Sequence, residues 1–294
     1  MTLTCFSQIR EFEKYYPENH LFRKLQVKSV IDTIGSPSGR HYKKEFYTLC
    51  RQTALYYIED SVRTYFKYTK SGDTLIRSHL NTINGREEQV YKFEKLVYNT
   101  KGKIELYQSC QKNYGTNNQT SQCEMSKFYY DEKGRLITKL DYSENKYKKP
   151  FSENVQLVDT LMSLVDVNNY WYDNINRLAV KKQMIGRPEY RAVDSFFYDK
   201  SNKLIERTSY QKQGYLGEFA IGDVTRTELI KYDLNKTTKT WFVKYSNWEQ
   251  DQFKTTEIEI DEYIYYPNGL EKIWYRQSGD RNKSMLTYKV YEFY

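Results

Sequence analysis

Short runs of aromatic and β-branched residues, separated by polar turn sequences, recur along most of this chain. The runs 127–130, 170–172 and 195–198 each end in Tyr, and alternating polar and apolar residues resume after the turn that follows. Aromatic and β-branched side chains suit a pleated, half-buried surface, and a turn between two such runs is typical of a hairpin. The pattern therefore predicts an all-β chain.

A seven-residue pattern marks the turns: Tyr, Asp or Asn, two variable residues, Gly or Asn, a basic residue, then Leu or Ile. It starts at Tyr98, Tyr130, Tyr172 and Tyr198, and looser copies start at Tyr68, Tyr232 and Tyr266. An Asp or Asn in a turn can bond the backbone two residues on, and a Gly or Asn can adopt a positive φ. The predicted turn residues are Asp131, Asp173 and Asp199 at the second position, and Gly102, Gly134, Asn176 and Asn202 at the fifth.

These seven hairpins supply about fourteen strands, and consecutive strands usually lie next to each other. We therefore predict one long antiparallel meander over residues 41–294, twisted or curled so that one face is buried. Adjacent aromatic residues such as Phe196 and Phe197 send rings to both faces. This indicates either packing on both sides of the sheet or one exposed aromatic face that binds a partner.

Two segments depart from the hairpin pattern. Residues 9–40 predict an N-terminal arm with one or two short helices, interrupted by Pro17. Residues 154–166 carry apolar side chains at helical spacing, which predicts an amphipathic helix inserted between the hairpins of Tyr130 and Tyr172. The alternative for this second segment is a strand.

With these repeats the chain resembles the YD-repeat family, the tyrosine-aspartate repeats of Rhs-type proteins. The family pattern, Tyr-Asp-x-x-Gly-Arg-Leu, is met best by residues 130–136, and the likeness extends from residue 65 to residue 294. The resemblance implies an extended, spiralling antiparallel sheet used for surface binding, for toxin encapsulation, or in short members for neutralising or accommodating another protein. The chain lacks the length of the large members, so the resemblance does not extend to a closed shell around a toxin.

The composition and the charge of the chain argue against two classes of protein, nucleic-acid-binding proteins and proteins with a membrane-spanning helix. The chain carries 46 basic and 38 acidic residues, mixed along its length, and 31 Tyr. A protein that follows nucleic-acid phosphates concentrates its basic residues on one stripe, so nucleic-acid binding is not expected. No stretch approaches the roughly 18 apolar residues of a membrane-spanning helix.

The first eight residues and two of the cysteines indicate the cellular compartment in which the protein is located. Residues 1–8 read as the remnant of a signal peptide, with an ordinary cytoplasmic start as the alternative. Cys110 and Cys123 flank a polar segment that predicts a hairpin loop, and a cross-strand disulfide between them suits an exported protein, whereas in the cytosol they would remain buried thiols. We therefore expect a periplasmic or cell-surface protein of a Gram-negative cell.

Signatures of catalysis are missing from the sequence. The three histidines, His20, His41 and His79, have no metal-ligand spacing, and no nucleophile, metal or nucleotide motif occurs. A row of carboxylates at Glu257, Glu259 and Asp261 predicts a solvated strand face, with a glycosidase pair or a calcium site as the alternative. The expectation is a protein that is no enzyme and carries neither metal nor cofactor.

The leading hypothesis is a protein-binding or scaffolding subunit of the bacterial cell envelope, for example an accessory subunit of an outer-membrane transport or secretion complex. One alternative is an immunity-like protein that neutralises a toxin. Another is a carbohydrate-binding protein or glycoside hydrolase, with sugars stacked on Trp171, Trp241, Trp248 or Trp274. The last strand is strongly β-prone and predicts a free edge to which a partner adds a strand, with Tyr288, Val290, Tyr291, Phe293 and Tyr294 as its contact residues.

Overall fold

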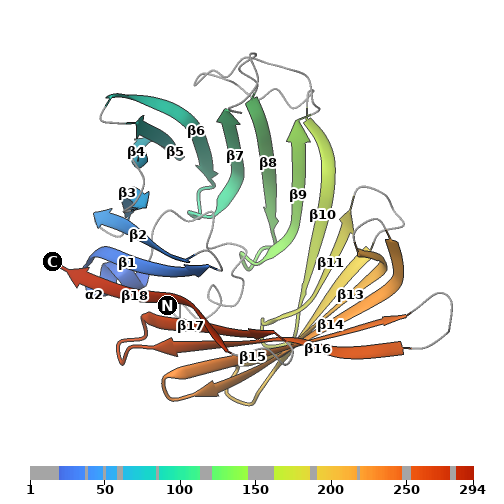
Figure 1. The fold of residues 1–294 in the computed structure, drawn as a ribbon. Coiled ribbons are helices and arrows are strands. Elements are labelled where there is room, and N and C mark those ends of the chain that lie inside the picture. The colour runs from blue at the N-terminus through green and yellow to red at the C-terminus, as the bar shows by residue number, and fades with distance from the viewer. Residues whose placement is uncertain are drawn as a thin grey trace. The chain divides into compact units, whose positions relative to one another are not determined.

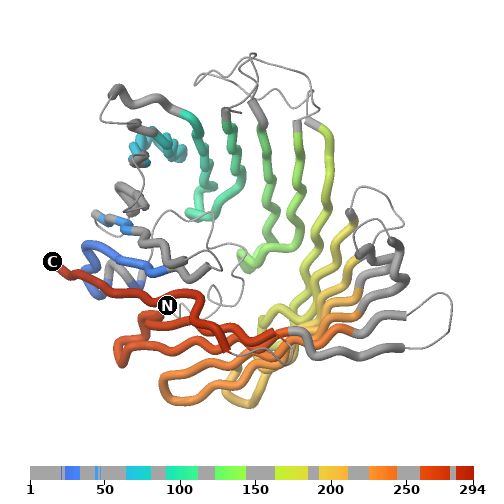
Figure 2. Tube along the Cα trace, in the orientation of Figure 1, coloured from blue at the N-terminus to red at the C-terminus, as the bar shows by residue number. Residues whose placement is uncertain are grey.

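A computed structural model describes most of the chain (Figure 2). The described residues are 20–36, 39–48, 51–57, 62–83, 86–112, 121–144, 162–185, 191–216, 219–246, 253–278 and 283–294. The predicted signal-peptide remnant at residues 1–8 lies outside them, as do Cys5, Cys50 and Trp248.

The described residues form eighteen strands and one short helix, α2 (His20–Leu25) (Figure 1). The first nine strands are β1 (Val27–Ser36), β2 (Gly39–Thr48), β3 (Arg51–Tyr57), β4 (Val62–Ser71), β5 (Thr74–Ile83), β6 (Arg86–Tyr98), β7 (Ile104–Lys112), β8 (Ser121–Tyr130) and β9 (Leu136–Glu144). The others are β10 (Met162–Tyr172), β11 (Leu178–Ile185), β12 (Arg191–Tyr198), β13 (Leu204–Leu216), β14 (Phe219–Asp233), β15 (Lys236–Ser246), β16 (Phe253–Tyr265), β17 (Glu271–Ser278) and β18 (Ser284–Phe293).

Successive strands pair antiparallel, and the chain divides into two compact units. Of the described residues, unit A comprises those within 20–29, 43–168 and 292–294, and unit B comprises those within 30–42 and 169–291. In unit A the pairing runs from β2 through β9, and in unit B it runs from β11 through β18. The prediction of an all-β antiparallel meander is confirmed.

Each unit has its own buried apolar side chains, and the Leu or Ile that closes the seven-residue pattern is prominent among them. In unit A these include Leu75, Leu96, Ile104, Phe128 and Leu136; in unit B they include Tyr170, Leu178, Ile230, Tyr263 and Leu270. Where the residue after a turn is buried, as at Ile104, Leu136 and Leu178, it fixes which face of the new strand points inward, because side chains alternate between faces along a strand.

Three details of the predicted fold need correction. The described residues contain eighteen strands rather than about fourteen, because β1 to β3 and β18 lie outside the seven hairpins that the turn pattern marks. In the predicted N-terminal arm, α2 has only six residues and β1 begins at Val27. The helix predicted at 154–166 is wrong for its described part, since residues 162–166 belong to β10, as the alternative of a strand expected.

Candidate functional site

The four close copies of the pattern form turns with the same backbone hydrogen bonds. In the first copy the Asn99 amide donates to the carbonyl of Lys103 over 2.8 Å, and the Gly102 amide donates back to the carbonyl of Asn99 over 2.8 Å. The turns at 131–135, 173–177 and 199–203 repeat this pair of bonds. The φ angles at Gly102, Gly134, Asn176 and Asn202 are 71°, 73°, 68° and 64°. These are the positive values that the aligned turn position predicts.

The second residue of the pattern closes the turn with its side chain. Asp173 Oδ1 accepts hydrogen bonds from the amides of Ile175, at 3.1 Å, and of Arg177, at 2.8 Å. Its other oxygen accepts from Arg177 Nε at 2.6 Å. Partial burial on its own raises the pKa of Asp173, but the hydrogen bonds from Arg177 outweigh it and lower the pKa below its ordinary value. The basic residue of the pattern thus neutralises the acidic one.

Contacts between successive turns explain the remaining positions of the pattern. Tyr130 Oη donates to the carbonyl of Ile104, at 2.7 Å. Ile104 closes the preceding copy, so the first residue of one copy bonds the last residue of the copy before it. In unit B, Arg177 Nη1 also donates to Asn202 Oδ1 at 3.0 Å, and the Arg177 guanidinium lies 4.6 Å from the ring centre of Tyr198. Comparison of the repeats within the sequence identified these residues. It did not identify their contacts, which depend on how neighbouring hairpins lie against each other.

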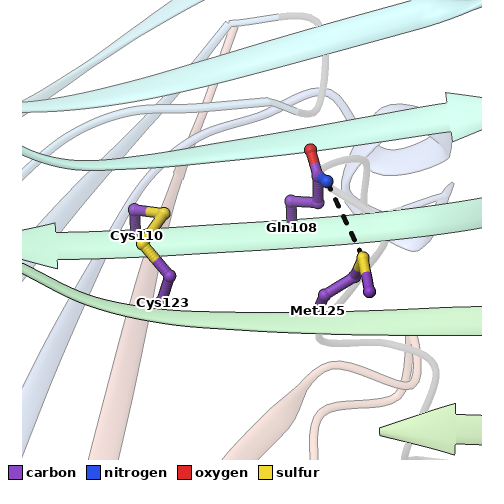
Figure 3. Close-up of a disulfide and its surroundings, with 4 residues drawn as sticks. All are labelled: Gln108, Cys110, Cys123 and Met125. Carbon is purple, nitrogen blue, oxygen red and sulfur yellow. Dashed lines mark hydrogen bonds between the residues drawn. A yellow bond between two sulfur atoms is a disulfide. The ribbon is translucent and has the colours of Figure 1, made fainter. Parts of the chain in front are cut away.

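Cys110 and Cys123 form a disulfide in unit A (Figure 3). The two residues are register partners on β7 and β8, with Cα atoms 4.1 Å apart, and both side chains are buried beside Phe93. Gln108 and Met125, the next pair on the same face, are also buried, and Gln108 Nε2 lies 3.8 Å from the Met125 sulfur. The bridge therefore joins the two arms of the hairpin within a closely packed part of the sheet.

The last strand does not offer the free edge that the sequence predicts. β18 pairs with β17 and, in addition, with β1 and β2. In unit A the Tyr294 amide donates to the carbonyl of Gln26 at 3.0 Å, and Tyr294 Oη donates to the carbonyl of Tyr47 at 2.7 Å. The prediction of a strand-adding edge formed by Tyr288, Val290, Tyr291, Phe293 and Tyr294 is therefore corrected: β1 already occupies that position.

A buried carboxylate stands among cations on one face of unit A. Glu94, only 3% exposed, accepts hydrogen bonds from Arg77 and from Tyr107, the latter at 2.8 Å. His79 Nε2 lies 2.8 Å from one oxygen of Glu94, and Lys92 Nζ lies 3.1 Å from the other. These residues come from β5, β6 and β7.

The surroundings of Glu94 decide its charge. Burial alone raises its pKa, but the hydrogen bond from His79 and the charges of Arg77 and Lys92 outweigh burial and hold the pKa far below the ordinary range. Burial lowers the pKa of His79 despite the neighbouring carboxylate, and burial together with Glu94 raises the pKa of Tyr107. A carboxylate bonded on both oxygens is poorly placed to take up a proton in catalysis, and its role here is to hold three strands together.

A second series of charged side chains, three of them buried carboxylates, crosses β12 to β17 in unit B. Register pairing puts its members on one face: Asp194, Arg207, Glu228, Lys239, Asp261 and Arg276. Arg207 contacts Asp194 at 3.1 Å, Lys239 contacts Glu228 at 2.6 Å, and Arg276 contacts Asp261 at 2.8 Å. We call these six residues the charge ladder.

The charge ladder overturns the expectation of a solvated acidic row. Asp261 is only 2% exposed, and Arg276 binds both of its oxygens while also lying 3.4 Å from Glu259. The side chain of Glu257 lies outside the described ones. Within the described part of the chain no group of three metal-ligating side chains comes together. The alternation of residues along the sequence predicts correctly that Glu259 and Asp261 share a face. Their common partner, Arg276, lies on β17 and could not be identified from the sequence of β16 alone.

The opposite face of unit B exposes large apolar side chains. Trp171, Met184, Phe197, Tyr210 and Leu229 are 46%, 39%, 50%, 38% and 36% exposed. Lys182 connects the first two, since it lies 5.3 Å from the Trp171 ring centre and two residues before Met184. Residues paired across neighbouring strands lie on the same face. Lys182 pairs with Val193, and Val193 pairs with Tyr210. Glu206, four residues before Tyr210 on the same strand, pairs with both Phe197 and Leu229. We call these five residues the apolar face; it spans β10 to β14.

The other candidate residues are scattered. Trp171 belongs to the apolar face, whereas Trp274 stacks on Tyr263 with ring centres 5.7 Å apart, on the face that carries the charge ladder. The side chains of His20 and His41 lie outside the described ones, and His79 belongs to the Glu94 cluster. None of the described helices is long and apolar enough to cross a membrane.

Comparison of the sequence with protein-family models and with curated proteins finds no match. Among solved structures, the chain is similar to a porin-like protein from Bacteroides uniformis, with 8% identity and a TM-score of 0.41 over 81% of this chain and 97% of that one. It is also similar to a protein of unknown function from Bacteroides fragilis, with 14% identity and a TM-score of 0.24 over 58% of this chain and 96% of that one. At these scores neither likeness assigns a function to the chain.

Proposed function

We propose that the chain is a non-catalytic binding protein of the bacterial cell envelope, and that it holds another protein against the apolar face of unit B. The observation that carries this proposal is the exposure of five large apolar side chains on one sheet face. Clustered exposed apolar residues, rather than single ones, are typical of interaction sites, and aromatic residues contribute most of the binding energy in such sites.

The opposite side of the same strands supports a binding role. The charge ladder ties β12 to β17 together through paired side chains. These paired charges lie on the face opposite the apolar face, so they do not occupy the apolar face itself. A face carried by hydrogen-bonded strands loses little conformational freedom when a partner binds. A rigid apolar face is therefore suited to recognition.

The disulfide supports a location outside the cytosol. A buried bridge between Cys110 and Cys123 requires an oxidising compartment to form and persist, which the periplasm and the cell surface provide. In its most concrete form the partner is a component of an outer-membrane transport or secretion complex.

Affinity purification of the tagged chain from the envelope of its own cells tests the proposal. We expect one protein to co-purify in stoichiometric amount with the unchanged chain and to be lost with the double variant Phe197→Ser, Leu229→Ser. The matched control is Leu164→Ser, because Leu164 is 49% exposed but lies in unit A. Equal recovery of the partner with the double variant would overturn the assignment to the apolar face.

The same purification separates the other functional classes. A small toxin domain recovered alone with the chain would favour an immunity-like protein. Retention on an oligosaccharide resin that depends on Trp171, with no protein partner, would favour carbohydrate binding.

A further inference from the structure

Four hairpin turns of unit B lie next to one another at the same end of their strands. They join β10 to β11, β12 to β13, β14 to β15 and β16 to β17. Arg177 of the first bonds Asn202 of the second, and Lys203 of the second lies 5.1 Å from the ring centre of Tyr232 at the third. The Tyr265 amide beside the fourth turn donates to the carbonyl of Asn235 at 2.8 Å. We call residues 173–177, 199–203, 231–236 and 266–270 the turn rim.

Two aliphatic side chains stand out from the turn rim into solvent. Leu234 is 97% exposed and Ile175 is 53% exposed. Asp233 pairs with Lys236, so Leu234 and Asn235 form a two-residue hairpin loop, a place where polar residues and glycine are usual. Neither turn gains stability from an aliphatic side chain in contact with water, so these two residues are available to contact something outside the chain.

Basic side chains surround these aliphatic ones. Lys200, Lys203 and Lys231 are all exposed. The turn rim contains five basic and three acidic residues, and two of the acidic ones are held within their own turns: Asp173 pairs with Arg177, and Asp199 accepts bonds from the amides of Ser201 and Lys203. Asp233 is the third. The turn rim therefore presents a net positive charge next to its two exposed aliphatic side chains.

We propose that the turn rim rests on the surface of an anionic lipid bilayer. Leu234 and Ile175 enter the boundary between headgroups and acyl chains, and Lys200, Lys203 and Lys231 contact the negatively charged headgroups. Aliphatic residues combined with lysines whose long stems reach back to the headgroups are the chemistry of interfacial membrane binding. Lysine is by contrast depleted from protein–protein interfaces, which favours a bilayer over a protein as the occupant. The turn rim adjoins one end of the apolar face, since Trp171, Phe197 and Leu229 each lie two residues before a turn of the rim.

Co-sedimentation of the purified full chain with lipid vesicles tests this proposal without any protein partner. We expect binding to mixed phosphatidylcholine–phosphatidylglycerol vesicles, weaker binding to phosphatidylcholine vesicles, and release by added salt. The double variant Leu234→Asp, Ile175→Asp should lower the partition onto anionic vesicles by about tenfold or more, because it removes both apolar contacts and adds like charge. Lys200→Glu with Lys231→Glu should remove the preference for anionic lipid.

The control is Leu164→Asp, which changes an aliphatic residue outside the turn rim that is 49% exposed, close to the 53% of Ile175, and should leave vesicle binding unchanged. Circular dichroism and thermal unfolding of each variant establish that it is folded. No binding of the unchanged chain to anionic vesicles would overturn the proposal, as would equal binding by the Leu234→Asp, Ile175→Asp variant. Loss of an envelope protein partner with this variant, in the absence of vesicle binding, would instead make the turn rim a protein-binding site.

Discussion

The hydroxyl of Tyr198 donates a hydrogen bond of 2.8 Å to the carbonyl oxygen of Leu178, which links the first residue of one turn pattern to the last residue of the preceding pattern. Tyr130 and Ile104 repeat this relationship in unit A. Phe would provide the same aromatic ring at this position. Only Tyr also provides a hydroxyl that can donate the hydrogen bond. The contact therefore gives a physical reason for the Tyr that opens these two copies.

Replacement of Tyr198 by Phe should lower the free energy of unfolding by about 1 kcal/mol, the usual contribution of one intramolecular hydrogen bond. Urea unfolding followed by circular dichroism measures the loss. The matched control is Tyr129→Phe, since Tyr129 is 46% exposed and should cost little. Equal losses in the two variants would contradict a specific role for the bond to Leu178.

Replacement of Gly134 by Val should cost more than about 1 kcal/mol, because φ is 73° and a β-branched residue is strained there. The strain lies in the backbone: a Cβ at Gly134 would meet only the Lys103 side chain, at 3.5 Å. Gly134→Asn should cost less, since Asn176 and Asn202 hold the same position with positive φ. Comparison of the two unfolding midpoints tests this, and a Val variant as stable as the Asn variant would contradict it.

The turns could be predicted from sequence because their causes are local. Asp173 reaches amides two and four residues away, and Asn176 adopts its φ within the same turn. The charge ladder could not be predicted in this way. Arg276 reaches Asp261 only through the register between β16 and β17, and that register is set by the whole hairpin. The pairing of β1 with β18 joins opposite ends of the sequence, which explains why an edge was expected where none exists.

Acid should destabilise the chain through the Glu94 cluster. Burial lowers the pKa of His79 below its ordinary 6.5, so the stability that its neutral form provides is lost as the pH falls below that value. The pKa of Glu94 is also lowered from 4.5, so the contribution of its charged form is present above that pH and is lost as the pH falls further toward the depressed value.

Replacement of Glu94 by Gln should therefore cost about 3 kcal/mol at neutral pH, because it leaves Arg77 and Lys92 without their buried anion. The loss should be smaller in acid. Urea unfolding at several pH values measures both effects, with Glu132→Gln in an exposed turn as the control. A loss in Glu94→Gln that does not change with pH would rule out this account of the cluster.

Removal of the disulfide by the double variant Cys110→Ala, Cys123→Ala should cost about 3 kcal/mol, the chain-entropy value for a loop of this length. Because both sulfurs are buried, dithiothreitol should act on the unchanged chain only when denaturant opens the hairpin. Thiol labelling with and without urea tests this. Rapid labelling of both cysteines in reductant alone would show that the bridge is accessible in the folded chain.

Removal of residues 292–294 should destabilise unit A rather than uncover a binding edge. These residues contribute the bond from Ser29 to Glu292 at 2.5 Å, the ion pair of Lys44 with Glu292 at 3.5 Å, and the two bonds from Tyr294 to the carbonyls of Gln26 and Tyr47. Several hydrogen bonds lost together should lower the free energy of unfolding. Tyr294→Phe loses only the bond to Tyr47 and should cost about half as much or less.

Thermal unfolding of the truncated chain and of Tyr294→Phe, with the envelope partner assayed in parallel, separates the two accounts of β18. If β1 occupies the position beside β18, the truncation lowers the melting temperature, and partner binding falls only as far as the folded fraction falls. The apolar face lies on β10 to β14 of unit B and should keep its affinity in the molecules that remain folded. A truncated chain of unchanged stability that no longer binds its partner would show that the C-terminal residues contact the partner directly, and the apolar face would lose its assignment.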